Sequence, residues 1–134
     1  MAVNSRFSTS VHALLLLAAD SSKLHRSEDL AERLKTNPVV VRRVFSQLRQ
    51  AGLVISHKGP SGGSKLARGA ADITLRDIYQ AVHLQGTVNV PSLPAGLQSA
   101  LKSVLSTATR AFEDELSHTT LAQFAKRAAR KPKR

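Results

Sequence analysis

The sequence predicts a mainly helical fold with one small β-hairpin, followed by a separate long helix. Three observations lead to this prediction. A short β-rich run, Leu53–Ile55, stands between segments of helical apolar spacing and is followed by a glycine-rich turn. Residues 33–71 hold eight basic side chains and no Asp or Glu, yet they keep a regular apolar pattern. An apolar stripe then runs from Leu97 to Leu116, over about six helical turns.

The composition bounds the class of protein. The 134 residues fit one domain, or a small domain with an oligomerisation arm. A formal net charge of +11 and a pI of about 11.2 favour an anionic partner, nucleic acid first and an acidic membrane surface second. The chain has no cysteine, which excludes disulfides, cysteine-bound zinc and thiolate-held iron–sulfur clusters. The apolar run 13–19 is too short to span a bilayer and is interpreted as part of a core helix, so we expect a cytoplasmic protein without a membrane partner.

The first two helices are predicted from their polar starts and apolar faces. The first spans residues 6–19, with Ser8 or Ser10 as its N-cap. Ser27 is expected to cap the second, ahead of two acidic residues that suit the positive end of a helix. The inner faces consist of Val11, Leu14, Leu15 and Ala18 in the first helix and Leu30, Ala31 and Leu34 in the second.

The third helix has the strongest start and stop signals. Asn37 is a good N-cap, and Pro38 is tolerated at the first helical position. Gly52 is predicted to end the helix in a left-handed conformation. The buried face is expected to contain Val41, Val44, Phe45 and Leu48. Two helices joined by a tight turn, the second of them basic, form a helix-turn-helix pattern.

A hairpin directly follows this pair of helices. Leu53–Ile55 is the β-rich run, Gly59–Gly63 turns the chain, and Ser64–Ala67 returns it. A helix-turn-helix followed at once by a hairpin predicts a winged helix.

The rest of the chain adds one more helix to this domain and then continues into a linker and a long helix. Thr74, with Asp77 three residues later, predicts a capped helix that closes the core. We therefore assign residues 1–84 to a winged helix-turn-helix domain and residues 85–96 to an uncharged linker. Residues 97–134 are assigned to a long dimerisation helix, a short C-terminal helix and a basic tail.

The long helix has nothing of its own to cover its apolar face, so pairing with a second copy is the simplest solution. The expected interface consists of Leu97, Leu101, Val104, Leu105, Ala108, Phe112 and Leu116. Thr119 or Thr120 is predicted to cap the last helix, whose apolar side chains are Leu121, Phe124 and Ala128.

Several motifs, weak one by one, are specific in their order and spacing. They are Ser8–Ala18, Leu48–Val54, Lys58–Ala67, Ile73–Val82 and Thr119–Ala122. With them the chain resembles the bacterial winged-helix transcriptional regulators that include IscR, NsrR and CymR. The resemblance implies a dimeric DNA-binding transcription factor, usually a repressor, whose long helix crosses that of its partner.

The chain also departs from the pattern of that family. Several members sense iron–sulfur status or nitric oxide through three cysteines between the winged domain and the long helix, and the corresponding segment here, His83–Pro91, has none. Members often carry an aromatic residue at the position of Val40 and an acid at that of Arg42. A different operator, or a larger sequence-independent component of binding, is therefore expected.

The candidate DNA-binding residues lie in three places. The start of the third helix contributes Asn37, Pro38, Val39, Val40, Arg42 and Arg43, and the hairpin contributes Lys58, Ser61, Gly62, Gly63 and Lys65. Ser8 is added because a helix start exposes N–H groups to phosphate. Either arginine can bind guanine or only a phosphate, and the two valines can meet thymine methyl groups. The alternative for the arginines is solvated surface charge, which we disfavour because residues 33–71 hold no acid to pair them.

Other functions have less support. A winged-helix module that binds RNA or an acidic protein partner, and selects no operator, stays open as the second hypothesis. An enzyme is not expected, because the sequence shows no nucleophile–base pair, paired carboxylates or phosphate-binding loop. The histidines lack metal-ligand spacing, so no metal and no cofactor are expected. The sequence does not identify a small-molecule effector.

Overall fold

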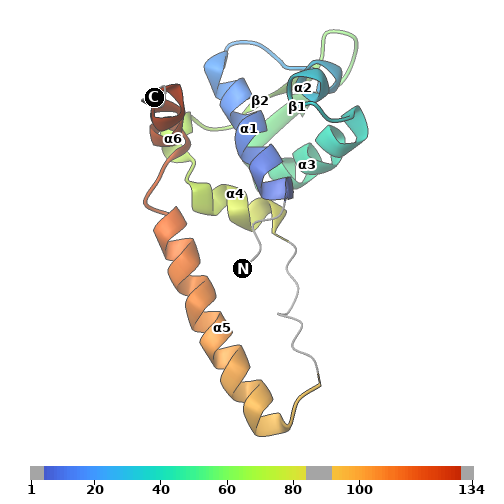
Figure 1. Cartoon of the computed structure of the whole chain (residues 1–134). Helices are drawn as coiled ribbons and strands as arrows, with labels where there is room; N and C mark the ends of the chain where they lie inside the picture. The colour runs from blue at the N-terminus through green and yellow to red at the C-terminus, as the bar shows by residue number, and fades with distance from the viewer. Residues whose placement is uncertain (1–4, 84–91, 131–134) are drawn as a thin grey trace.

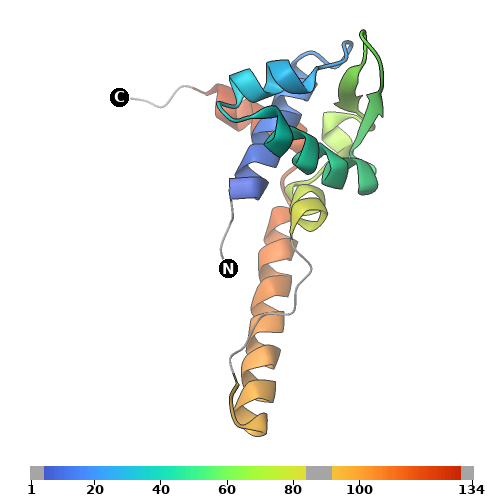
Figure 2. The ribbon, with the colours of Figure 1, turned by 90° about the vertical axis from the view of Figure 1, so that its right-hand side faces the viewer.

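The computed structural model describes residues 5–83 and 92–130, and its elements follow the predicted order (Figure 1). They are α1 (Ser5–Ala19), α2 (Ser27–Arg33), α3 (Pro38–Gln50), β1 (Val54–His57), β2 (Gly63–Leu66), a 3-10 turn η1 (Ala70–Asp72), α4 (Leu75–Val82), α5 (Ala95–Leu116) and α6 (Leu121–Ala129). The four helices α1 to α4 and the hairpin gather into one body, from which α5 extends (Figures 1 and 2). The prediction of a mainly helical winged fold is confirmed.

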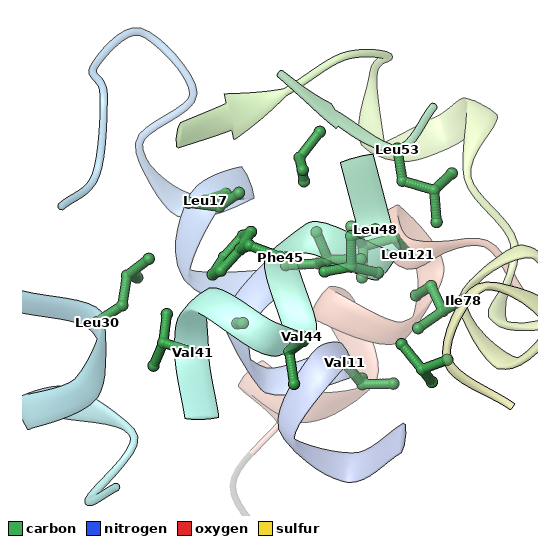
Figure 3. Close-up of a cluster of buried hydrophobic side chains, with 14 of the residues drawn as sticks. Val11, Leu17, Leu30, Val41, Val44, Phe45, Leu48, Leu53, Ile78 and Leu121 are labelled. Atoms are coloured by element: carbon green, nitrogen blue, oxygen red, sulfur yellow. The ribbon is translucent and has the colours of Figure 1, made fainter. Parts of the chain in front are cut away.

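The core is mainly aliphatic, as the shortage of aromatic residues in the sequence requires. The predicted inner face of α3, which comprises Val41, Val44, Phe45 and Leu48, is buried (Figure 3). It packs with Leu17 from α1, Leu30 from α2 and Ile78 from α4. Leu121, from the C-terminal α6, is fully buried in the same cluster. Burying such a set removes apolar surface from water, which is the main stabilising contribution in a domain of this size.

Most of the predicted caps are present. The Asn37 side chain accepts a hydrogen bond from the Val40 N–H at 3.0 Å, and Pro38 is the first residue of α3. Gly52 ends that helix with a φ of +76°. Thr74 and Asp77 form a reciprocal capping box at the start of α4, with bonds of 2.9 and 3.1 Å. These signals are local in the chain, which explains why sequence reasoning found them.

Two predicted caps are wrong. Helix α1 begins at Ser5, so Ser8 lies inside it, and the buried Ser10 hydroxyl donates to the Arg6 carbonyl at 2.7 Å. Ser27 is already the first residue of α2, and the N-cap is Arg26, whose side chain makes no capping bond. The start of α2 is set by a tertiary contact, because the nearby His25 is extended and pairs with Ser64 of the hairpin.

The hairpin is antiparallel and pairs Val54 with Leu66 and His57 with Gly63. A third segment, which the sequence analysis missed, joins its edge. The His25 N–H donates to the Ser64 carbonyl, and the Ser64 N–H donates to the His25 carbonyl, both at 2.8 Å. The approach is so close that a Cβ on Gly63 would lie 2.7 Å from the His25 carbonyl oxygen. The wing is therefore tied to the segment between α1 and α2.

Gly62 provides a test of this packing. A Cβ there would lie 2.1 Å from the His57 carbonyl oxygen. Because the obstacle is backbone of the same hairpin, Gly62→Ala is expected to lower the free energy of unfolding by about 2 kcal/mol, and Tm by about 8 °C for a chain of this size. The matched control is Gly96→Ala in α5, where a Cβ meets nothing within 4 Å. Equal Tm values for the two variants would contradict the close packing of the hairpin.

The two C-terminal helices behave differently. Helix α5 begins at Ala95, two residues before the predicted start, and none of its residues is buried. Residues 85–91 of the predicted linker, together with residue 84, lie outside the described residues. Helix α6 returns to the winged domain, where the Leu121 N–H donates to the Ile73 carbonyl at 2.7 Å. Thr120 caps α6, as predicted. The division into residues 1–84, 85–96 and 97–134 stays a prediction, and the packing of α6 couples its last part to the first.

The C-terminal end of α5 packs against the winged domain, whereas its N-terminal half projects away from it (Figures 1 and 2). The Tyr79 ring contacts the Phe112 ring edge to face, with centroids 5.0 Å apart. The Gln80 amide donates to the Glu113 carboxylate at 2.8 Å. These contacts fix the orientation of α5 relative to α4. None of the helices in residues 5–83 and 92–130 has the length and apolar character needed to cross a membrane.

Candidate nucleic-acid interface

The outer face of α3 is open to solvent. Val39 is 58% exposed, and Arg43 lies one helical turn further along the same face, opposite the core residues. Arg43 makes no ion pair with any residue in the described part of the chain. Val40 is half-buried, and the Asn37 side-chain oxygen is used by the helix cap. Val39 and Arg43 are therefore exposed on α3 and make no capping bond or ion pair with any described residue.

Arg42 does have an acidic partner, contrary to the expectation from its stretch of sequence. Its Nη2 lies 3.3 Å from Oε1 of Glu28 in α2. Residues 33–71 contain no acid, but the packing of α2 beside α3 brings one in from outside that stretch. The two partners are 14 positions apart, so the charges along one stretch of the chain do not show this ion pair.

Arg26 is a second residue that the sequence analysis missed. Its Nη1 donates to the Pro60 carbonyl in the hairpin turn at 2.7 Å, across 34 positions of sequence. Its Nε lies 3.8 Å from Oε2 of Glu28. A continuous series of contacts therefore links the turn of the wing, through Arg26 and Glu28, to Arg42 on α3. No local signal in the sequence could have revealed this series.

These residues line one groove of about 430 Å³ between α2, α3 and the wing. Its walls include Arg26, Glu28, Arg42, Arg49, His57, Lys58, Gly62 and Gly63. Four of these side chains are permanent cations and one is an anion, so the groove is suited to a negatively charged ligand. A hydrogen bond from its own backbone N–H, together with the guanidinium groups of Arg26 and Arg42, keeps the pKa of Glu28 below its usual value. Glu28 is therefore ionised at neutral pH.

The other predicted residues are distributed unevenly around this groove. Lys58 and Ser61 are exposed on the wing, and Lys65 is half-buried in β2. Gly62 is buried, and its N–H donates to the Gly59 carbonyl at 3.0 Å, so its role is to shape the turn. Ser8 lies elsewhere, in an apolar groove that Phe7, Val11, His12 and Phe124 help to line.

The apolar stripe of α5 is divided between two environments. Leu97 is 60% exposed and Val104 is 65% exposed, and Leu101 is also exposed. Phe112 is half-buried against Tyr79, and Leu105 and Leu116 are half-buried too, whereas Ala108 is exposed. The first half of the stripe is thus uncovered, and the second half adjoins the winged domain.

Comparison with known proteins assigns the chain to a protein family. A family model for Rrf2, described as an iron-dependent transcriptional regulator, matches residues 3–127. The chain belongs to the Rrf2 family. YwnA of Bacillus subtilis, a candidate HTH-type transcriptional regulator, is 36% identical over 127 residues, which cover 89% of this chain and 93% of YwnA.

Solved structures agree with this Rrf2 assignment. IscR of T. potens superimposes with a TM-score of 0.74 at 28% identity, covering 100% of this chain and 94% of that protein. A candidate DNA-binding protein of known crystal structure gives 0.74 at 35% identity, covering 90% and 98%. The resemblance drawn from the motifs is confirmed, and the chain is a DNA-binding transcriptional regulator rather than an enzyme.

The iron in the Rrf2 family's description does not fit the residues of this chain as an iron–sulfur cluster. Such clusters are held by thiolates, and the 134 residues include no cysteine. Within residues 5–83 and 92–130, no three His, Asp or Glu side chains gather at one place to hold a metal ion. Most of the segment that carries the cysteines in other members, residues 84–91, lies outside the described residues. The residues of this chain therefore do not fit a thiolate-held cluster.

Proposed function

We propose that this Rrf2-family regulator binds a palindromic operator as a homodimer and selects its sequence with the outer face of α3. The observation that carries the proposal is the pairing of Val39 and Arg43 on an open helix face, directly beside a cationic groove. The helix face with Val39 and Arg43 supplies contacts to base edges, and the cationic groove supplies positive charge for the DNA backbone. The family resemblance favours repression as the outcome of binding.

Each candidate residue has a separate role in this proposal. Arg43 donates two hydrogen bonds to the O6 and N7 atoms of a guanine in the major groove, and Val39 contacts a thymine methyl group. Arg42, Lys58 and Lys65 bind backbone phosphates and position the helix without selecting a sequence. Ser61, at the exposed turn of the wing, contacts the backbone or the adjacent minor groove.

The dimer follows from the uncovered half of the α5 stripe. Leu97, Leu101 and Val104 expose apolar surface that a second copy covers by placing the same stripe against it, since a two-fold interface uses the same patch twice. A pair of α3 helices would then enter successive major grooves on one side of the DNA. The two half-sites are expected about one turn of DNA apart.

Selection from random double-stranded DNA with the purified protein, without added ligand, tests this function. The expected result is one enriched palindrome, which the protein then protects as a discrete footprint in its own upstream region. Uniform binding with no enriched sequence would contradict operator selection and favour the second candidate, a module for RNA or for an acidic protein.

The salt dependence of binding forms a second arm of this experiment. If Arg42, Lys58 and Lys65 each bind a phosphate in both subunits, log affinity for the operator falls with log salt concentration with a slope of about −5. Binding that does not change between low and high salt would exclude a phosphate-based interface.

A further inference from the structure

The Glu28 carboxylate lies where the groove would hold an anion. Its two oxygens face different guanidinium groups, Oε1 at 3.3 Å from Arg42 Nη2 and Oε2 at 3.8 Å from Arg26 Nε. Arg49 and Lys58 line the same groove. A carboxylate shared by two arginines in a cationic groove has the same donors that a phosphate would use.

The groove also has one wall that is fixed independently of Glu28. Arg26 donates from Nη1 to the Pro60 carbonyl at 2.7 Å while its Nε faces Glu28. The turn of the wing is therefore held whether or not Glu28 keeps its place. A ligand that displaces Glu28 meets donors from α3, from Arg26 and from Lys58 on the wing.

We propose that this groove binds one phosphodiester of the DNA backbone in each subunit, and that Glu28 occupies the site until the phosphate displaces it. The inference rests on the proposed function and deepens it, because it makes Glu28 a determinant of specificity. No base contact is required of Glu28. It acts by keeping Arg42 and Arg26 from binding phosphate in complexes that lack the correct register.

The displacement is accessible because the ion pairs are exposed. Arg42 and Glu28 have side chains that are more than half exposed, and such pairs hold weakly in water. The displaced carboxylate stays near the groove and repels the incoming phosphate. DNA whose register is fixed by base contacts of α3 holds its phosphate at the groove despite this repulsion. Random DNA makes no such base contacts, so its phosphates bind exposed cationic side chains outside the groove instead.

Glu28→Gln tests the inference, with Glu32→Gln as the matched control. Both variants remove one negative charge from α2, but Glu32 is exposed and forms no ion pair with any residue in 5–83 or 92–130. Glu28→Gln is expected to raise affinity for random DNA about ten-fold and affinity for the selected operator by only about two-fold. Its salt slope on random DNA is expected to steepen by about 2, because each subunit gains one phosphate contact.

A second variant shows whether Glu28 acts through Arg42. In an Arg42→Ala background, adding Glu28→Gln is expected to change the ratio of operator to random affinity much less than it does in the wild-type background. An undiminished effect in that background would overturn the inference, because Glu28 would then act without releasing Arg42 to bind phosphate. Thermal melting of each variant confirms that the compared proteins are folded.

The failure of this inference differs from the failure of the proposed function. If the wild-type protein selects an operator and Glu28→Gln behaves like Glu32→Gln, the displacement of Glu28 is wrong and the operator-binding function stands. If the wild-type protein selects no sequence, both proposals are wrong.

Discussion

Replacing Val104 by aspartate is expected to convert the regulator to a monomer and to lower its operator affinity by about 10²–10⁴-fold, because the second half-site no longer binds intramolecularly. Val104 is 65% exposed in the single chain, so a carboxylate there is solvated and the fold is retained. In a dimer the same carboxylate is buried against apolar side chains, which is strongly unfavourable. Sedimentation gives the mass, and titration of the operator gives the affinity.

Ser106→Asp is the matched control for this dimer prediction. Ser106 lies on the same helix, is exposed, and faces away from the apolar stripe. It adds the same charge at nearly the same distance from the winged domain, and the dimer is expected to persist. A Val104→Asp protein that stays dimeric and keeps wild-type operator affinity would show that the stripe is not the interface.

The parts of the fold that the sequence predicted well depend on neighbouring residues. The buried face of α3 repeats with helical spacing, and Asn37 and Gly52 mark its ends within one turn. Thr74 and Asp77 are three positions apart. Such signals act through bonds that form inside the element itself, so they hold whatever the rest of the chain does.

The parts that the sequence missed depend on contacts between distant segments. Ser27 was expected to be a cap, but His25 pairs with Ser64 and thereby sets where α2 begins. The fully buried Leu121 joins a core whose other members precede it by 39 or more positions. The apolar pattern of a short amphipathic helix shows which face is buried, but not which part of the protein that face packs against.

The same distinction applies to the DNA-binding surface. The net charge of +11 correctly indicated an anionic partner, because charge is a property of composition. It could not show that Arg42 is paired with Glu28 while Arg43 is unpaired among the described residues. The sequence predicted DNA contact equally for these two adjacent arginines, but their surroundings differ in the structure. Arg42 must break its ion pair with Glu28 to bind DNA, whereas Arg43 has no ion pair to break within the described part of the chain.

Arg43→Ala is accordingly expected to lower operator affinity by about a hundred-fold. A bidentate contact to guanine contributes about 1–3 kcal/mol, and the symmetric dimer loses two of them. Affinity for random DNA is expected to fall much less, and selection with the variant should lose the base preference at one position in each half-site. Competition titrations with operator and random DNA give both affinities at one salt concentration.

Two control variants separate charge from base recognition at Arg43. Arg110→Ala removes one positive charge from exposed α5, away from the groove, and is expected to leave operator affinity within about two-fold of wild type. Arg43→Lys keeps the charge but lacks the planar fork that grips guanine. It should therefore restore binding to random DNA without restoring operator preference. If Arg43→Lys binds the operator as tightly and as selectively as the wild-type protein, Arg43 contacts only phosphate, and operator selection must rest on Val39 and its neighbours on α3.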